Sequence, residues 1–146
     1  MEMTVPSDPA NIAPVRKAVE DLGVRGGLDA RSVCEMGLCV NEALANVIRH
    51  AYHGAADRPI RVQADCQNGE LLVTIRDWGD GVNPAEMPPR PYDPLEPGGL
   101  GLICMQKMMN EVRYVPQGDG MLLILRKRTT SGTAASSGAA QPTERP

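Results

Sequence analysis

The sequence has no phenylalanine, and its other aromatic side chains are limited to three tyrosines and one tryptophan. Proteins that bind single-stranded nucleic acids stack bases on several aromatic side chains, so a surface of this kind is excluded. Positive charge is also scarce, because 18 acidic residues outnumber 15 basic ones and give a formal net charge of −3. Such a chain has no general basic surface for duplex DNA or an anionic membrane, and we expect no direct binding to either.

Long hydrophobic runs are missing as well. No apolar segment reaches the roughly 18 residues that a transmembrane helix needs. The N-terminal residues Met1, Glu2, Met3 and Thr4 do not form the basic and apolar regions of a secretory signal peptide. We therefore expect a cytoplasmic protein that does not span a membrane.

The four cysteines lack the spacing of a metal or redox site. Cys34, Cys39, Cys66 and Cys104 form no C-x-x-C pair, and no histidine is placed to complete a zinc site. In a reducing cytosol they are most simply small buried hydrophobic residues.

Glycine and proline are plentiful, with 15 and 13 residues, and they mark where regular structure stops. Six of the prolines lie in residues 78–99, which predicts a long irregular segment, and such a loop in a compact domain usually has a function. From Thr129 onward the residues are small and polar, without apolar periodicity. We therefore predict one folded domain over residues 1–128 and a disordered tail over residues 129–146.

Hydrophobic periodicity predicts three helices and two hairpins within this domain. Helical spacing covers residues 11–22, 29–54 and 100–110. Alternating apolar residues predict strands over residues 60–66, 71–76, 111–116 and 121–127. Because tight turns join consecutive strands, the sheet should be mostly antiparallel, with the helices on one face. The predicted fold is a two-layer α+β sandwich.

A first polar cluster lies on the second predicted helix, on the face opposite its apolar stripe. Glu42 and Asn46 are one helical turn apart there. An amide oxygen suits Mg²⁺, and a carboxylate one turn away could accept a proton from an attacking hydroxyl or water. The same pair would also fit the solvated side of an ordinary amphipathic helix.

Two glycine clusters follow. Asp77, Gly79 and Gly81 come directly after a predicted strand, where an acid could accept a hydrogen bond from an exocyclic amine such as that of adenine. Turns also collect Asp and Gly for conformational reasons alone. Residues 98–101 (Gly-Gly-Leu-Gly) open the third helix, whose free N–H groups could hold phosphate, although glycine is also common at ordinary helix starts.

Taken together, these motifs resemble those of the histidine-kinase-like ATPases, in the branch of anti-sigma factor serine kinases. The resemblance is carried by the run over residues 41–52 (NEALANVIRHAY), which is similar to the N-box of that family. Asp77-x-Gly79-x-Gly81 resembles its adenine-binding box, and Gly99-Leu100-Gly101-Leu102 resembles its second glycine box. The similarity in motif order covers about residues 8–128.

The resemblance implies a Bergerat-type fold that binds ATP and Mg²⁺ and usually forms a homodimer. It also implies phosphorylation of a serine on a small anti-anti-sigma protein and capture of a sigma factor. By position, Glu42 would be the catalytic base, Asn46 the Mg²⁺ ligand, Asp77 the acceptor for the adenine amine, and residues 83–98 the ATP lid. Gly79 and Gly81 would line the adenine base. Gly99, Leu100 and Gly101 would form the box that binds the phosphates.

Two positions depart from the family pattern. Met121 follows Gly120 where many relatives carry a threonine, and no arginine directly precedes the second glycine box. These departures motivate an alternative to the kinase, an adaptor that binds ATP and captures a regulatory protein without phosphorylating it. A separate alternative is an ATP-binding domain from a longer signalling protein.

Overall fold

A single antiparallel sheet of five strands forms one layer of the protein. The computed structural model describes residues 1–80 and 101–130. Across the sheet the strand order is β1-β2-β3-β5-β4, and every neighbouring pair is antiparallel. The strands are β1 (Glu2–Pro6), β2 (Pro59–Gln67), β3 (Glu70–Asp77), β4 (Glu111–Pro116) and β5 (Met121–Arg128).

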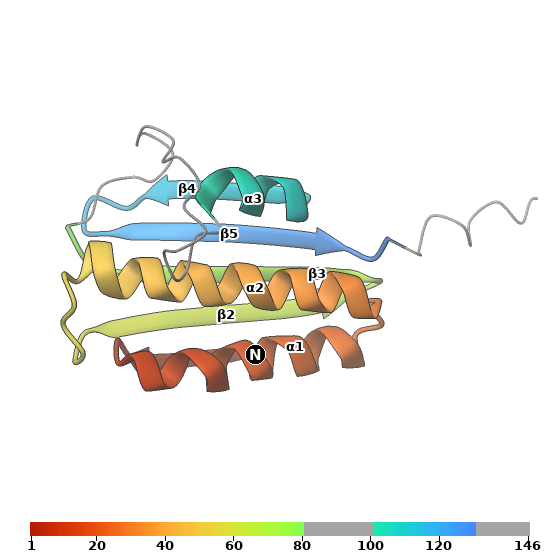
Figure 1. Ribbon diagram of the computed structural model, residues 1–146, viewed down its shortest axis with the longest axis horizontal. Helices are drawn as coiled ribbons and strands as arrows, with labels where there is room; N and C mark the ends of the chain where they lie inside the picture. The colour runs from red at the N-terminus through yellow and green to blue at the C-terminus, as the bar shows by residue number, and fades with distance from the viewer. Residues whose placement is uncertain (81–100, 131–146) are drawn as a thin grey trace, which may run out of the picture.

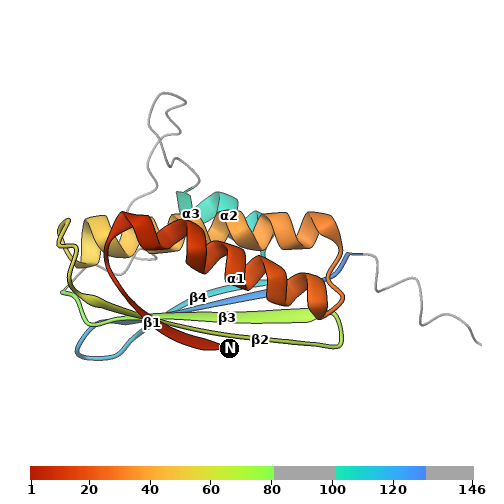
Figure 2. The same ribbon diagram turned by 90° about the horizontal axis from the view of Figure 1, so that it is seen from below.

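Three helices form the second layer. They are α1 (Ile12–Arg25), α2 (Ala30–Asn46) and α3 (Gly101–Met108). Figure 1 looks onto this layer, with α2 running between α1 and α3 across the sheet. Figure 2 shows that all three helices lie on one side of the sheet, and no described helix covers the other side. The predicted two-layer α+β sandwich is therefore confirmed.

The core lies between the two layers and is built from aliphatic side chains and methionine. Alternate residues of β3 point into it and are almost fully buried, as are residues of α2 such as Met36, Val40 and Leu44. Because side chains alternate across a strand, the residues between them face the uncovered side of the sheet. Long flexible methionines fill a core that has no phenylalanine.

The turn between β2 and β3 was predictable from two residues. Asn68 and Gly69 have φ angles of 54° and 73°, as a type I′ hairpin turn requires at both central positions. The predicted strands of both hairpins and the third helix are found within one or two residues of their expected ends. By contrast, no strand was predicted before the first helix, and β1 pairs there with β2, placing Met3 opposite Val62.

Two predicted helix ends differ from the structure. The first helix was expected to stop near Leu22, but it continues through Gly23 to Arg25, and Gly26 occupies the C-cap. The second was expected to run to Gly54, whereas α2 ends at Asn46 and gives way to a π-helical turn, Val47–Ala51. The wider turn is closed by hydrogen bonds such as that from Tyr52 N–H to the Val47 carbonyl, 2.9 Å.

The chain beyond β5 contacts the start of α2. Thr129 and Thr130 donate hydrogen bonds to the carboxylate of Asp29, at 3.1 Å and 2.5 Å, so contacts continue two residues past the predicted end of the domain. The remainder of the predicted tail, residues 131–146, lies outside the described residues. The same holds for the predicted lid, residues 83–98.

Two further expectations concern cysteines and membranes. All four cysteines are free, and Cys39 is buried as expected, but Cys34 is exposed and Cys66 and Cys104 are partly exposed. The prediction of four buried cysteines was therefore wrong, because Cys34 lies on the solvent side of α2. Among the described residues, no helix is long and apolar enough to cross a bilayer.

Candidate functional site

Glu42 lies on α2 and is buried, with only 5% of the residue exposed. It was expected on the solvated face of the helix, and that expectation was wrong. The physical reason is that α2 is covered on more than one side, since α3 packs beside it as well as the sheet beneath it (Figure 1). A carboxylate kept away from water in this way needs polar partners.

Those partners come from the next turns of the chain. Arg49 Nη2 lies 3.9 Å from Glu42 Oε1 and donates a hydrogen bond to Asn46 Oδ1 at 3.3 Å. Burial raises the pKa of Glu42, while the charge of Arg49 and a hydrogen bond from Asn46 oppose that rise. The result is a carboxylate that holds its proton more readily than an exposed glutamate does, as suits a proton acceptor working near neutral pH.

Asp77 is the second buried carboxylate and ends β3, with an exposed fraction of 5%. The N–H of Gly79 donates to its Oδ1 at 3.0 Å. Burial raises the pKa of Asp77, and backbone hydrogen bonds from Gly79 and Met121 counter this rise. The carboxylate is therefore oriented by two backbone donors at the end of its strand.

The structure brings the N-box helix and the Asp77 motif together through two contacts. Tyr52, the last residue of the N-box run, accepts a hydrogen bond at its hydroxyl from Trp78 N–H, 2.9 Å. A Cβ atom at Gly79 would lie only 2.3 Å from the Ala51 carbonyl oxygen, so no side chain fits there. Gly79 thus allows the strand end to approach the π-helical turn. This structural role adds to its predicted position beside the adenine base.

The third predicted cluster is described only in part. Gly101 begins α3 with a φ of 41° and is exposed, and no atom lies within 4 Å of the position a Cβ would take. Gly81, Gly99 and Leu100 lie outside the described residues. Among residues 1–80 and 101–130, none crowds this position of Gly101, and α3 itself packs next to α2.

The side-chain oxygen of Asn46 suits a metal ion that takes most of its coordinating oxygens from a bound molecule and water, and few from the protein. Within residues 1–80 and 101–130, no group of three or more His, Cys, Asp or Glu side chains could hold a metal ion. Mg²⁺ commonly takes one or two protein oxygens and completes its shell with phosphates and water. Asn46, partly exposed and one turn from Glu42, offers one such oxygen.

Two tyrosines near the candidate site were not singled out from the sequence. One position that departs from the family pattern, Met121, was singled out and does lie beside Asp77. Tyr52 joins the two motifs, and Tyr114 of β4 faces the helix layer. Burial raises the pKa of Tyr114 to about 12, and the negative charge of Glu42 adds to the rise. The alternation of β4 could have indicated that Tyr114 points inward. Met121 pairs with Asp77 in the β3–β5 register, so the departure lies at the candidate site.

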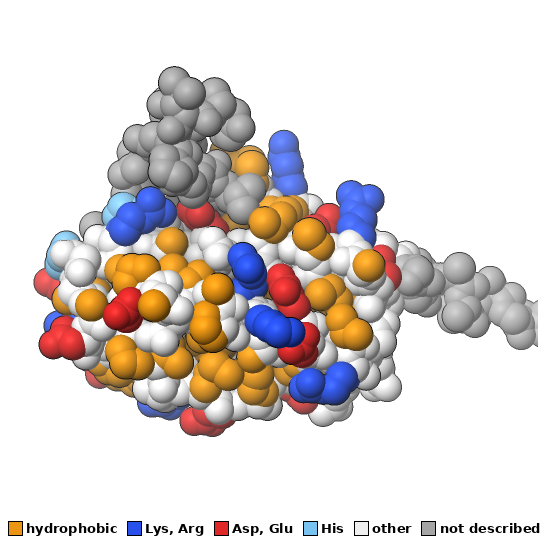
Figure 3. Space-filling model, turned by 60° about the horizontal axis from the view of Figure 1, so that its bottom comes forward, with side chains coloured by type: hydrophobic (Ala, Val, Ile, Leu, Met, Phe, Trp, Pro, Cys, Tyr) orange, Lys and Arg blue, Asp and Glu red, His pale blue; other side chains and the backbone are white. Residues whose placement is uncertain are grey.

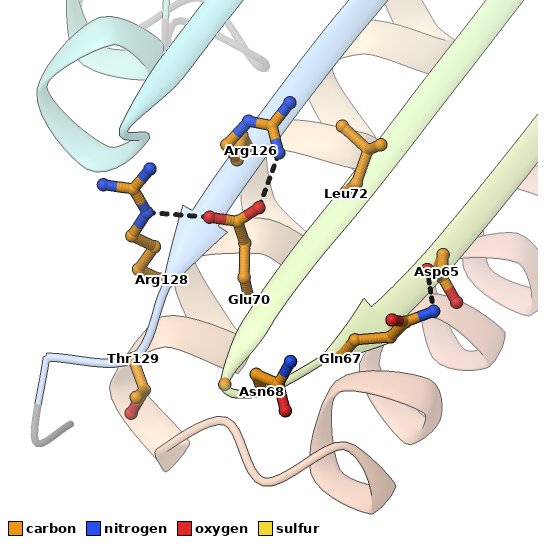
Figure 4. Close-up of a pocket in the computed structure, with 9 residues that line it drawn as sticks. Asp65, Gln67, Asn68, Glu70, Leu72, Arg126, Arg128 and Thr129 are labelled. Atoms are coloured by element: carbon orange, nitrogen blue, oxygen red, sulfur yellow. Dashed lines mark hydrogen bonds and ion pairs between the residues drawn. The ribbon is translucent and has the colours of Figure 1, made fainter.

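A hollow of about 580 Å³ lies at the other end of β3 and contains none of the predicted site residues. It is lined by side chains of the β2–β3 hairpin and the end of β5. Figure 4 shows Arg126 and Arg128 pointing toward Glu70, with ion-pair distances of 2.5 Å and 2.7 Å. Three of its charged side chains, Glu70, Arg126 and Arg128, are thus paired with one another, and Asp65 accepts a hydrogen bond from Gln67 at 2.9 Å.

The fold and the buried polar motifs at one end of α2 and β3 define a class of α+β domain related to histidine kinases. The sequence profile of the histidine kinase-like ATPase domain family matches residues 5–127. That match covers most of the chain, and the protein belongs to this family.

Individual relatives agree with this assignment. A serine-protein kinase RsbW of Bacillus velezensis is 27% identical over 135 residues, which cover 87% of this chain and 84% of the relative. An anti-sigma F factor of Halalkalibacterium halodurans is 32% identical over 105 residues, covering 68% and 72%.

Among solved structures, the RsbU and RsbW domains of a Mycobacterium tuberculosis protein superpose with a TM-score of 0.64 at 17% identity, covering 88% of this chain and 31% of that one. At this identity the similarity supports the fold alone.

Proposed function

We propose that this protein is an ATP-dependent serine kinase that phosphorylates a small anti-anti-sigma protein and captures a sigma factor. The observation that carries the proposal is the buried Glu42, one helical turn from Asn46, on a helix that is followed by Tyr52 and its contact with the Asp77 motif, in a chain of the histidine kinase-like ATPase family. Relatives named serine-protein kinase and anti-sigma F factor support both activities. They also favour a kinase over an adaptor without catalytic activity.

Each residue of the site has a distinct task in this proposal. Asp77, oriented by the Gly79 and Met121 amides, accepts a hydrogen bond from the adenine amine of ATP. Asn46 Oδ1 is a ligand for Mg²⁺, which would neutralise charge on the phosphates. Glu42 accepts the proton of the substrate serine hydroxyl as that oxygen attacks the γ-phosphate. Arg49 donates a hydrogen bond to Asn46, and its charge counters the rise in the pKa of Glu42 that burial causes.

The glycines complete the proposed nucleotide site. The adenine base would lie against Gly79 and Gly81. The phosphates would receive hydrogen bonds from the backbone N–H groups of Gly99, Leu100 and Gly101. Phosphoryl transfer depends on positioning and charge neutralisation more than on covalent groups. A small set of residues is therefore sufficient for the reaction.

Phosphate transfer to a purified anti-anti-sigma protein tests the proposal. The protein is mixed with Mg²⁺ and ATP labelled on its γ-phosphate, and label on the partner is measured for the wild type and for Glu42→Gln. We expect transfer by the wild type and loss of transfer in the variant, with ATP binding retained in both. ATP binding without transfer by the wild type to any cognate partner would contradict the kinase.

We further propose that the protein acts in the cytoplasm as a homodimer, as the family resemblance implies. Four free cysteines suit a reducing compartment. Sedimentation of the ATP-bound protein at several concentrations tests the dimer, and a monomer at every concentration would contradict it.

A further inference from the structure

The only tryptophan of the chain stands in a cluster of arginines at the end of β3. The guanidinium carbons of Arg61 and Arg76 lie 5.1 Å and 4.6 Å from the centre of the Trp78 ring. Arg58 stacks over Tyr52 at 4.9 Å and donates a hydrogen bond to the Trp78 carbonyl at 3.4 Å. We call Arg58, Arg61, Arg76 and Trp78 the Trp78 cluster.

The two strand arginines of this cluster face the side of the sheet that no described helix covers. Arg61 of β2 is paired directly with Arg76 of β3 in the sheet register. Their strand neighbours Ile60, Val62 and Ile75 are buried under the helices, and successive side chains alternate between the two faces. Arg61 and Arg76 therefore lie on the opposite side of the sheet from α2, the helix that carries Glu42 and Asn46 (Figure 2).

Positive charge at the Trp78 cluster is only partly neutralised. Arg76 pairs with Asp119 at 2.5 Å, whereas Arg58 and Arg61 form no ion pair with any residue in the part of the chain that the structure describes. Like charges directly opposite each other on neighbouring strands are unfavourable. This cluster therefore has an excess of unpaired arginine, although the chain as a whole has a net charge of −3. Folding alone does not explain this local excess.

Several other charged parts of the surface are balanced by ion pairs. On α1, Lys17 lies 3.2 Å from Asp21, and Arg16 lies 3.7 Å from Glu20. Figure 3 shows basic and acidic side chains interspersed on the face that it views. The contrast marks the Trp78 cluster as a place where acidic groups from another molecule would be accommodated.

Apolar side chains adjoin the cluster on the same face. Leu122 of β5 is paired with Arg76 of β3 on one side and Val115 of β4 on the other. Both apolar residues are partly exposed. Arginines and a tryptophan next to aliphatic side chains are the residue types that form protein-binding surfaces.

We propose that the Trp78 cluster, with Leu122 and Val115, docks an acidic protein segment that also carries apolar side chains. Carboxylates of the segment pair with Arg58 and Arg61, and its apolar side chains lie on Trp78, Leu122 and Val115. Nucleic acid is disfavoured because a single tryptophan gives little stacking surface and the chain as a whole is acidic. Arg61 and Arg76 of this surface lie on the other face of the sheet from Glu42, while Trp78 stands between Asp77 and Gly79 of the proposed nucleotide site.

Trp78 fluorescence provides a direct test, because no other tryptophan contributes to the signal. The full chain, without nucleotide, is titrated with a short acetylated peptide of glutamates interspersed with leucines. We expect a saturable change in emission that weakens as salt is added. Arg61→Glu should weaken binding about tenfold, the size of effect that two altered charge contacts produce.

Arg25→Glu is the matched control, since Arg25 is exposed at the end of α1 and forms no ion pair with a described residue. It changes the net charge equally and should leave peptide affinity unchanged. Equal weakening by both variants would overturn the proposal, as would equal binding of a lysine–leucine peptide or tighter binding of a DNA oligonucleotide. A changed sedimentation coefficient for Arg61→Glu with unchanged peptide binding would instead identify an interface between two copies, and would also overturn it.

Discussion

Arg76 and Asp77 are consecutive residues of β3, yet they belong to opposite faces of the sheet and to different chemistry. Asp77 points toward the helix layer, is buried, and is held by backbone amides. Arg76 lies on the uncovered face, stacks over Trp78 and pairs with the exposed Asp119. The alternation of a single strand therefore separates a buried carboxylate of the proposed nucleotide site from an exposed charged surface.

The pKa values of carboxylates also shift in opposite directions on the two faces of the sheet. On the helix side, burial raises the pKa values of Glu42 and Asp77. On the uncovered side, Glu70 has its pKa held below the ordinary value by hydrogen bonds from Arg128 and Arg126. A carboxylate that keeps its proton readily suits catalysis, whereas one paired with arginines contributes to the surface.

The largest expected effect comes from removing the carboxylate of Glu42. Glu42→Gln should lower the rate of phosphate transfer by about 10²–10⁴-fold, the usual contribution of a general base. The variant should also be more stable to unfolding at neutral pH, because it removes a charge whose burial is unfavourable. Single-turnover transfer and urea unfolding measure the two effects. Glu70→Gln, on the uncovered face, should leave transfer unchanged.

The same carboxylate sets the low-pH limit of activity. The transfer rate of the wild type should fall as the pH is lowered through the raised pKa of Glu42, and so at a higher pH than the ordinary value of 4.5 would give. The folded-state pKa is raised, so the contribution of Glu42 to stability decreases as pH rises from 4.5 through that raised value. Glu42→Gln should remove this dependence. A decline in rate that is centred at or below pH 4.5 would argue against Glu42 as the base.

Asp77→Asn tests the helix side through nucleotide affinity. The Gly79 and Met121 amides would bind the new side-chain oxygen, which leaves its NH₂ group facing the adenine amine, donor against donor. Calorimetric titration should show ATP binding weaker by about 10- to 100-fold, as expected for loss of a hydrogen bond to a charged group. Asp119→Asn on the other face is the control, and equal weakening there would contradict the separation of the faces.

Local signals were sufficient for much of the fold. Asn68 and Gly69 specify their hairpin turn by their own backbone preferences, and the apolar stripe of α2 identified the long central helix. The strand β1 was missed because five residues at a sheet edge are stabilised by pairing with β2, which lies more than fifty residues away in the chain. The π-helical turn after Asn46 was also missed, and its residue Ala51 lies against Gly79, which is distant in the sequence.

For the site, the sequence indicated the residues but not their environment. Glu42, Asn46 and Asp77 were identified by motif, and their roles stay predictions. The burial of Glu42 did not follow from the helix pattern, because it depends on elements packed around α2 that are distant in the sequence, such as α3 and β5. The Trp78 cluster was not anticipated at all, since only the β2–β3 register brings Arg61 opposite Arg76.

Gly79→Ala tests whether the two motifs require their close contact. The added Cβ would collide with the Ala51 backbone, which cannot move without shifting the π-helical turn. We expect a loss of about 2 kcal/mol in the free energy of unfolding, as for other overpacked sites. Gly37→Ala is a suitable comparison, because its Cβ would meet only the flexible Glu20 side chain. A similar, small effect of both substitutions would show that the contact is dispensable.

The smallest expected effect is a difference in stability between substitutions of Arg76 and Arg61, which lie opposite each other on the uncovered face. Arg76→Gln loses its hydrogen bonds to Asp119 and to the Asp77 carbonyl, and should cost about 1 kcal/mol of stability in urea unfolding. Arg61→Gln loses a contact with Trp78 but also relieves repulsion from Arg76, so its stability should stay within about 0.5 kcal/mol of the wild type. Arg61 would then be dispensable for folding, which leaves binding as its role. A loss for Arg61→Gln as large as that for Arg76→Gln would instead make both arginines structural.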